Sequence, residues 1–137
     1  MTVWLAVIDL STGKGVSVNA GHLHPAVKRA GGDYRLIKYP HSLAAAIMEN
    51  VTFGEHEFTL SPGDTLFVYT DGVTEAKNAE GKLFGEARLL QALNAKTEEP
   101  APEEIIRNVR EHIAAFADGA SQFDDITMLC MTYFGKA

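Results

Sequence analysis

The sequence predicts an α+β domain with mostly antiparallel β-sheet and flanking helices. Three observations favour this class: strand-like segments fill the first half of the chain, an amphipathic helix pair follows, and an apolar strand closes the chain. Because that last strand must return to a sheet formed earlier, strands and helices belong to one α+β unit. The 137 residues are enough for one ordinary domain.

Composition narrows the class of protein. Hydrophobic residues make up 46% and charged residues 22%, as in soluble globular chains. The net charge of −6 argues against nucleic acid or an anionic membrane as the main partner. The single cysteine, Cys130, rules out an internal disulfide and fits a reducing, cytoplasmic location. Apolar runs are far shorter than the ~18 residues of a membrane span. The N-terminal apolar run has no basic stretch before it, so we expect no signal peptide.

The first hairpin opens the chain. Residues 3–10 form a nearly unbroken apolar run, which predicts a strand buried on both faces. Turn-forming residues fill positions 11–15, and residues 16–19 alternate between apolar and polar, as a half-buried strand does. These three segments therefore predict a β-hairpin.

Further short strands follow before the helices. Residues 26–30 and 34–39 flank a Gly-Gly-Asp turn, and residues 42–49 are alanine-rich enough for one or two helical turns. Residues 55–60 alternate and end at a Ser-Pro-Gly-Asp turn, and residues 65–70 predict a buried strand.

The helix pair and the last strand complete the predicted order. Residues 83–93 have apolar spacing that suits a short helix. Pro102 is placed to open a second helix, which Asp118 and Gly119 stop. Its apolar face holds Ile105, Ile106, Val109, Ile113 and Phe116. Residues 126–134 then predict the closing strand.

Asp71 is the first candidate for chemistry. It follows the predicted buried strand 65–70, and Gly72 comes next. An isolated Asp-Gly pair is most often a chain reversal. The functional alternative is a carboxylate held at a strand end, where it could ligate a hard cation.

Asp124 and Asp125 form the second candidate, just before the closing strand. Adjacent like charges repel, so either both are solvated or one faces a cation that offsets the repulsion. If strands 65–70 and 126–134 are neighbours, Asp71 and Asp124 would converge.

His22 and His24 are a weaker candidate, for zinc. A closed zinc site needs four ligands, and Cys130 is the only thiol, so we favour a strand exit in which these histidines bond to backbone. The chain has no standard phosphate loop and no Gly-x-Ser-x-Gly nucleophile motif. If the protein is an enzyme, metal-activated water is the expected attacker.

Several segments together resemble a known family. They are Val-Asn-Ala-Gly-His at residues 18–22, the strand and Thr-Asp-Gly-Val-Thr-Glu-Ala within residues 61–76, Phe-Gly at 84–85, and Asp-Asp-Ile-Thr at residues 124–127. In this order and spacing they resemble the C-terminal half of a bacterial SpoIIE/RsbU-type phosphatase. Such enzymes are metal-dependent PPM (PP2C-like) protein Ser/Thr phosphatases.

The resemblance implies a fold, a cofactor and a reaction. The fold is an αββα sandwich, with two Mn²⁺ or Mg²⁺ ions bound by acids at strand ends. By resemblance Asp71 and Asp124 are metal ligands, while Gly72 and Asp125 lie beside them or face the substrate. Metal-activated water would hydrolyse phosphoserine or phosphothreonine on a signalling protein, such as an anti-sigma-factor antagonist. The family also implies an upstream sensor or receiver domain.

One family segment is missing from this sequence. The first half of the usual domain supplies a further metal-binding aspartate in an Asp-x-x-Gly-His-Gly-like segment, and Asp9 does not match that position. We therefore expect residues 1–137 to be a single partial domain that binds metal weakly and is weak or inactive alone. Uncovered apolar surface and a free sheet edge would favour a homo-oligomer.

Two alternatives stay open at this point. One is a non-catalytic phosphatase-like module that binds or switches partners. The other is a dimerisation domain with solvated acids. The family resemblance assigns no chemical role to Asn19, Gly21 and His22 in its Asn-Ala-Gly-His segment.

Overall fold

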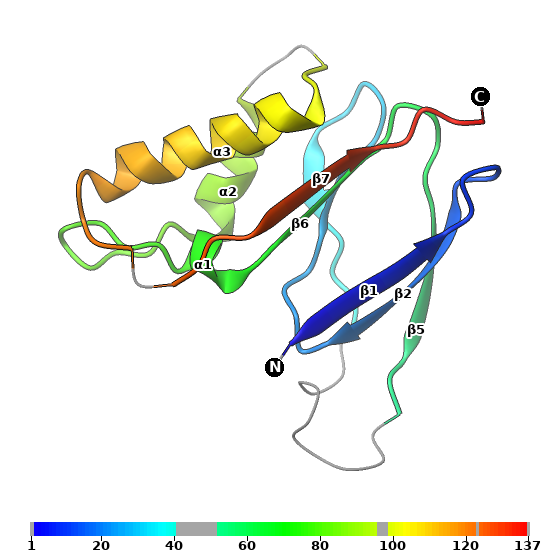
Figure 1. The fold of residues 1–137 in the computed structure, drawn as a ribbon, viewed down its shortest axis with the longest axis horizontal. Helices are drawn as coiled ribbons and strands as arrows, with labels where there is room; N and C mark the ends of the chain where they lie inside the picture. The colour runs from blue at the N-terminus through cyan, green and yellow to red at the C-terminus, as the bar shows by residue number, and fades with distance from the viewer. Residues whose placement is uncertain (1, 41–51, 96–98, 123, 137) are drawn as a thin grey trace.

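Two antiparallel sheets form the body of the protein (Figure 1). The computed structural model describes residues 2–40, 52–95, 99–122 and 124–136. Sheet A has the order β1-β2-β5, from strands β1 (Val3–Ile8), β2 (Lys14–Ala20) and β5 (Glu55–Thr59). Sheet B has the order β4-β3-β6-β7, from β3 (Ala26–Lys28), β4 (Tyr34–Leu36), β6 (Thr65–Tyr69) and β7 (Met128–Thr132).

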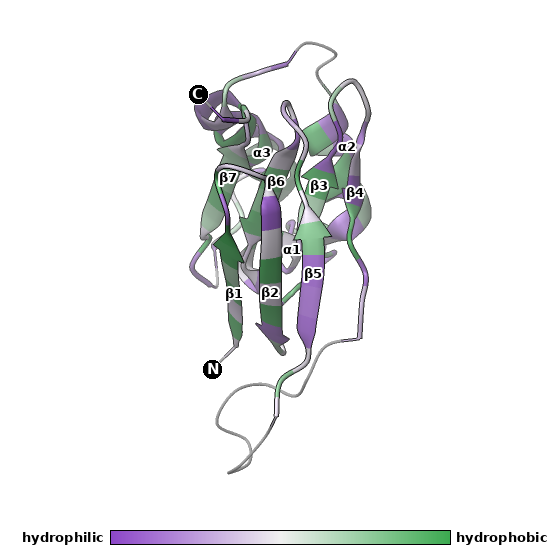
Figure 2. Ribbon diagram, turned by 90° about the vertical axis from the view of Figure 1, so that its right-hand side faces the viewer, coloured by the Kyte–Doolittle hydropathy of each residue, from purple (hydrophilic) through white to green (hydrophobic). Residues whose placement is uncertain are grey.

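Helices cover the outer face of sheet B. The helices are α1 (Asp71–Thr74), α2 (Gly85–Asn94) and α3 (Pro102–Ala117). Figures 1 and 2 show α2 and α3 on the side of sheet B that faces away from sheet A. The described layers are therefore sheet A, sheet B and helices, which confirms the predicted α+β class with antiparallel sheets.

Strand β6 lies at the centre of this arrangement. Phe67 and Tyr69 belong to the core between sheet B and the helices, and Leu66 belongs to the core between the two sheets. All three are at most 4% exposed. Full burial of a large apolar side chain contributes about 1.5–3 kcal/mol, so β6 anchors both cores. Its predicted burial is confirmed.

Helix α3 follows the sequence prediction closely. Pro102 occupies its first turn, where the missing backbone N–H costs no hydrogen bond. Ile105, Val109 and Ile113 are buried against the sheet at helical spacing. The helix ends at Asp118, whose φ of 45° is left-handed.

The burial of β1 was predicted wrongly. The hairpin of β1 and β2 forms, with Leu5 opposite Val18 and Val7 opposite Val16. However, β1 is an edge strand that is half-buried on one face only, and Leu5 and Val7 are 61% and 72% exposed. No described element covers the outer face of sheet A (Figure 2). An apolar run alone cannot reveal that its second face lacks a cover.

Other differences concern the ends of elements. Helix α2 begins at Gly85, so Leu83 lies outside it and is 47% exposed. Strand β7 is shorter than the predicted 126–134, and α1 was not predicted. The predicted helical turns at 42–49 fall outside the described residues. In the described part of the chain, no helix combines the length and hydrophobicity that crossing a bilayer requires.

Candidate metal centre

Strands β6 and β7 bring the two acidic segments together. They pair antiparallel, with Tyr69 opposite Met128. Beyond this pair, the Thr70 N–H donates to the Thr127 carbonyl at 3.0 Å, and the Thr127 N–H donates to Thr70 Oγ1 at 3.1 Å. Thr70 Oγ1 also donates to the Asp125 carbonyl at 3.2 Å. The two strands are therefore neighbours, which is the condition under which the sequence predicts that Asp71 and Asp124 converge.

Gly72 makes this approach possible. It is buried at the start of α1, against the backbone of residue 125. A Cβ atom on Gly72 would come within 2.2 Å of the Asp125 carbonyl oxygen and 3.3 Å of the Ile126 nitrogen. Any larger residue would have to push the two segments apart, so glycine is required here for close approach.

Three carboxylates stand at this end of sheet B, and we call Asp71, Asp124 and Asp125 the acidic corner. All three residues are exposed. Asp71 is the first residue of α1. Asp124 Oδ1 accepts a hydrogen bond from the Asp125 N–H at 2.8 Å, and Gln122 Nε2 donates to the Asp124 carbonyl at 2.7 Å. The loop before β7 is thus held by its own hydrogen bonds.

The acidic corner supplies donors of the right class for Mn²⁺ or Mg²⁺ but not a full set. Hard dications prefer carboxylate and other oxygen ligands, about six in number. Within the described ranges, no three His, Cys, Asp or Glu side chains gather in the manner of a metal site. The described residues therefore offer part of a metal site, and ligation by Asp71 and Asp124 stays a prediction.

The Asn-Ala-Gly-His segment forms a tight strand exit. Asn19 is 1% exposed, and its Oδ1 accepts a hydrogen bond from the His22 N–H at 2.8 Å. Gly21 has a φ of +72°, a conformation that favours glycine. Asn19 Nδ2 has no hydrogen-bond partner among the described residues. The segment thus has a structural role that the sequence left unassigned.

His22 and His24 lie within hydrogen-bond distance of backbone carbonyl groups, as expected for a strand exit. His22 Nδ1 lies 3.1 Å from the Leu23 carbonyl oxygen, and His24 Nε2 lies 2.9 Å from the Tyr39 carbonyl oxygen. His24 also packs edge-on against the Tyr39 ring.

Cys130 offers no nucleophile. Burial raises the pKa of its thiol to about 11, so the thiol stays protonated at neutral pH.

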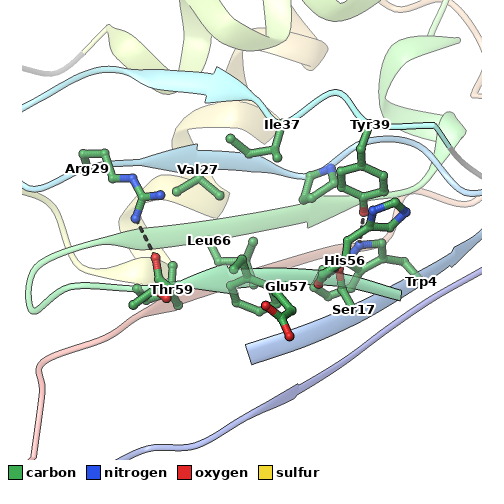
Figure 3. Close-up of a pocket in the computed structure, with 13 residues that line it drawn as sticks. Trp4, Ser17, Val27, Arg29, Ile37, Tyr39, His56, Glu57, Thr59 and Leu66 are labelled. Carbon is green, nitrogen blue, oxygen red and sulfur yellow. Dashed lines mark hydrogen bonds between the residues drawn. The ribbon is translucent and has the colours of Figure 1, made fainter. Parts of the chain in front are cut away.

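A small pocket of about 80 Å³ lies between the sheets (Figure 3). Trp4 Nε1 donates to the Tyr39 hydroxyl at 2.8 Å, and the Tyr39 ring stacks on His56 with centroids 4.1 Å apart. Apolar side chains such as Val27 and Leu66 complete the lining. Its position and lining identify it as a gap in the core between the sheets, away from the acidic corner.

A larger cleft of about 880 Å³ runs beside α3, and we call it the α3 cleft. Helix α3 forms one wall, and residues 119–122 with the start of β7 form the other. Its lining includes Arg107, Arg110 and Gln122. Sequence reasoning missed these residues because none belongs to a motif. It also gave Thr70 no role of its own, although Thr70 begins the Thr-Asp-Gly segment.

Three comparisons place this chain among known proteins. The family model described as Stage II sporulation protein E (SpoIIE) matches residues 1–134. Protein IcfG of Synechocystis sp. is 35% identical over 130 residues, which are 95% of this chain and 20% of that protein. This chain therefore spans about a fifth of its curated relative.

Two solved structures have a similar fold. One is the phosphatase domain of the cell fate determinant SpoIIE from Bacillus subtilis, presoaked with Mn, with a TM-score of 0.74 and 18% identity. The match covers 99% of this chain and 58% of that one. The other contains the RsbU and RsbW domains of Rv1364c from Mycobacterium tuberculosis, with a TM-score of 0.76 and 19% identity. There the match covers 99% of this chain and 37% of that one.

Proposed function

Because this chain belongs to the SpoIIE family and has the fold of PP2C-like phosphatase domains, we propose that it carries part of a phosphatase active site. The complete domain would hydrolyse phosphoserine or phosphothreonine on a bacterial signalling protein. The observation that carries this proposal is the close contact between the segment after β6 and the segment before β7. There Thr70 and Gly72 hold the segments of Asp71 and Asp125 against each other.

In the proposed site, Asp71 and Asp124 hold Mn²⁺ or Mg²⁺, and Asp125 faces the substrate side. A bound dication of this kind supplies an activated water and neutralises charge on phosphoryl oxygens. This chain's own residues position the two acidic segments. The Thr70 hydroxyl hydrogen-bonds to the segment before β7, and Gly72 lets α1 start directly against residue 125. The relative presoaked with Mn supports the choice of metal.

We propose further that the catalytic unit is larger than this chain. The match covers only 58% of the solved SpoIIE phosphatase domain, and the described residues hold no group of three metal-ligating side chains. A preceding segment would supply the missing ligand. The chain alone is then expected to bind metal weakly and to turn over phosphate esters slowly or not at all.

A phosphatase assay tests this proposal. The chain would be produced alone and with the preceding segment of its natural protein, then assayed on a phosphoserine peptide with Mn²⁺. We expect the longer protein to release phosphate and its Asp71→Asn and Asp124→Asn variants to lose most of that activity. Asp33→Asn, an exposed acid in a distant turn, is the matched control. Full activity in both corner variants would refute the proposed ligands.

The same shortage of ligands favours a second candidate. A phosphatase-like module that binds a partner without turnover needs no complete metal site, and the described residues contain no group of three metal-ligating side chains. If the longer protein binds a phosphoprotein yet releases no phosphate with any dication, this second function replaces the first.

A further inference from the structure

Resting on the proposed function, we propose that Gln122 is a positioning residue for Asp124. By holding the peptide group between Asp124 and Asp125, Gln122 keeps the Asp124 carboxylate in the conformation that is proposed to bind Mn²⁺ or Mg²⁺. Both ends of this peptide group are hydrogen-bonded. Its oxygen, the Asp124 carbonyl, accepts from Gln122 Nε2 at 2.7 Å. Its N–H, on Asp125, donates to Asp124 Oδ1 at 2.8 Å.

These two hydrogen bonds depend on each other because a peptide group is rigid. The group is planar, so its C=O and its N–H rotate together. Gln122 restrains the oxygen and therefore also restrains the direction of the N–H. That N–H in turn holds one oxygen of the Asp124 carboxylate. Without the bond from Gln122, rotation of the peptide group would turn the N–H away and release the carboxylate.

The next peptide group along the chain is held from β6. Its oxygen, the Asp125 carbonyl, accepts from Thr70 Oγ1 at 3.2 Å and lies against Gly72. Thr70 thus anchors the chain after Asp125, while Gln122 holds the peptide group before it, next to Asp124. Because the two contacts are separate, loss of the Gln122 amide should affect Asp124 without separating β6 from β7.

The chemistry of the Gln122 side chain suits this role. Its amide is neutral and donates N–H bonds, whereas a carboxylate can only accept them. A lysine could donate, but its charge would compete with a cation for the Asp124 carboxylate. The bond from Gln122 is at the short end of the range for N–H···O bonds, although the residue is exposed. Groups that orient a metal ligand in this way usually contribute to metal affinity.

Amide hydrogen exchange, measured by NMR on the metal-free chain, tests the hold on the peptide group. Gln122→Met keeps the length of the side chain but has no donor, so we expect the Asp125 N–H to exchange about two- to fivefold faster. The Thr127 N–H, which donates to Thr70 Oγ1, should keep its native rate. Gln91→Met, at an exposed position on α2, is the matched control and should change neither amide. No change at Asp125, or an equal change at Thr127, would overturn the inference.

Mn²⁺ affinity tests the consequence for the proposed site. In the longer protein that includes the preceding segment, electron paramagnetic resonance of free Mn²⁺ measures binding. We expect Gln122→Met to bind Mn²⁺ about three- to tenfold more weakly than the native protein or Gln91→Met, with the metal-free thermal midpoint unchanged. Equally tight binding by Gln122→Met would overturn the positioning role and leave the metal site standing. If the Asp125 N–H responds as expected but no version of the longer protein binds Mn²⁺, Gln122 still holds the peptide group and the proposed function fails.

Discussion

Gly72 lies so close to Asp125 that a methyl group on Gly72 would come within 2.2 Å of the Asp125 carbonyl oxygen. This contact joins the segment after β6 to the segment before β7. It predicts that Gly72→Ala lowers the free energy of unfolding by about 1–3 kcal/mol, because the backbones must separate. Urea denaturation followed by circular dichroism measures the change.

Gly54→Ala is the control for that substitution. A Cβ on Gly54 would meet nothing nearer than 3.9 Å, so this variant should keep the stability of the native chain. Equal stability of both variants would mean that the Gly72 contact is not tight.

Thr70 makes the second link across the corner. Its hydroxyl accepts from the Thr127 N–H at 3.1 Å and donates to the Asp125 carbonyl at 3.2 Å. Thr70→Val keeps the shape but removes these solvent-exposed hydrogen bonds, so we expect a loss of about 0.5–1.5 kcal/mol. Thr70→Ser retains the hydroxyl and should recover most of it. A valine variant as stable as the serine variant would contradict the role of these hydrogen bonds.

Asp64 predicts a specific pH dependence of stability. It is 1% exposed and accepts hydrogen bonds from the Ser61 and Ala30 N–H groups, both at 2.9 Å, and from Arg29. Burial acts to raise its pKa, but these hydrogen bonds and the Arg29 charge outweigh burial and lower the pKa below its usual value. The ionised carboxylate therefore stabilises the fold above about pH 4 and loses this effect as pH falls.

Asp64→Asn should thus be less stable than the native chain by about 1–3 kcal/mol at pH 7. The difference between the two proteins should shrink as pH falls toward 3, because the Asp64 carboxyl takes up a proton in the unfolded chain before it does so in the folded one. Urea unfolding at several pH values measures it. A difference that stays constant or grows on acidification would show that the carboxylate charge is not what stabilises this turn.

The outer face of β1 predicts self-association. Leu5 and Val7 are 61% and 72% exposed, and β1 is largely apolar with no helix over it in Figure 2. Exposed apolar surface beside a free strand edge favours pairing between copies. We expect light scattering to detect oligomers of the chain and Leu5→Lys/Val7→Lys to reduce them. A native chain that stays monomeric at high concentration would contradict this.

Much of the fold could be predicted because local signals agreed with the final structure. Pro102 and the apolar spacing of α3 mark a helix in any context, and β6 is apolar at every position after Thr65 because both of its faces are largely buried. β1 has a similar apolar sequence but one exposed face. Helix α1 escaped prediction because four residues beginning with Asp71-Gly72 have the composition of a turn.

The sequence was enough to select candidate site residues but not to show that they lie near one another. Asp71 and Asp124 are conspicuous beside apolar strands, yet only the pairing of β6 with β7 shows that their segments meet. Thr70 begins the Thr-Asp-Gly segment, but the sequence does not show its role, since its hydroxyl acts across more than fifty intervening residues. Contacts of that range depend on topology, which local periodicity does not encode.

Metal-dependent thermal stability tests the central claim most directly. The thermal midpoint of the chain would be measured with and without millimolar Mn²⁺, beside Asp71→Asn and the control Asp33→Asn. Binding to the native state raises stability by mass action, so we expect a rise of about 3–6 °C in the native chain and the control. The rise should vanish in Asp71→Asn. A rise of equal size in Asp71→Asn, or no rise even in the longer protein that includes the preceding segment, would contradict a metal site at this corner.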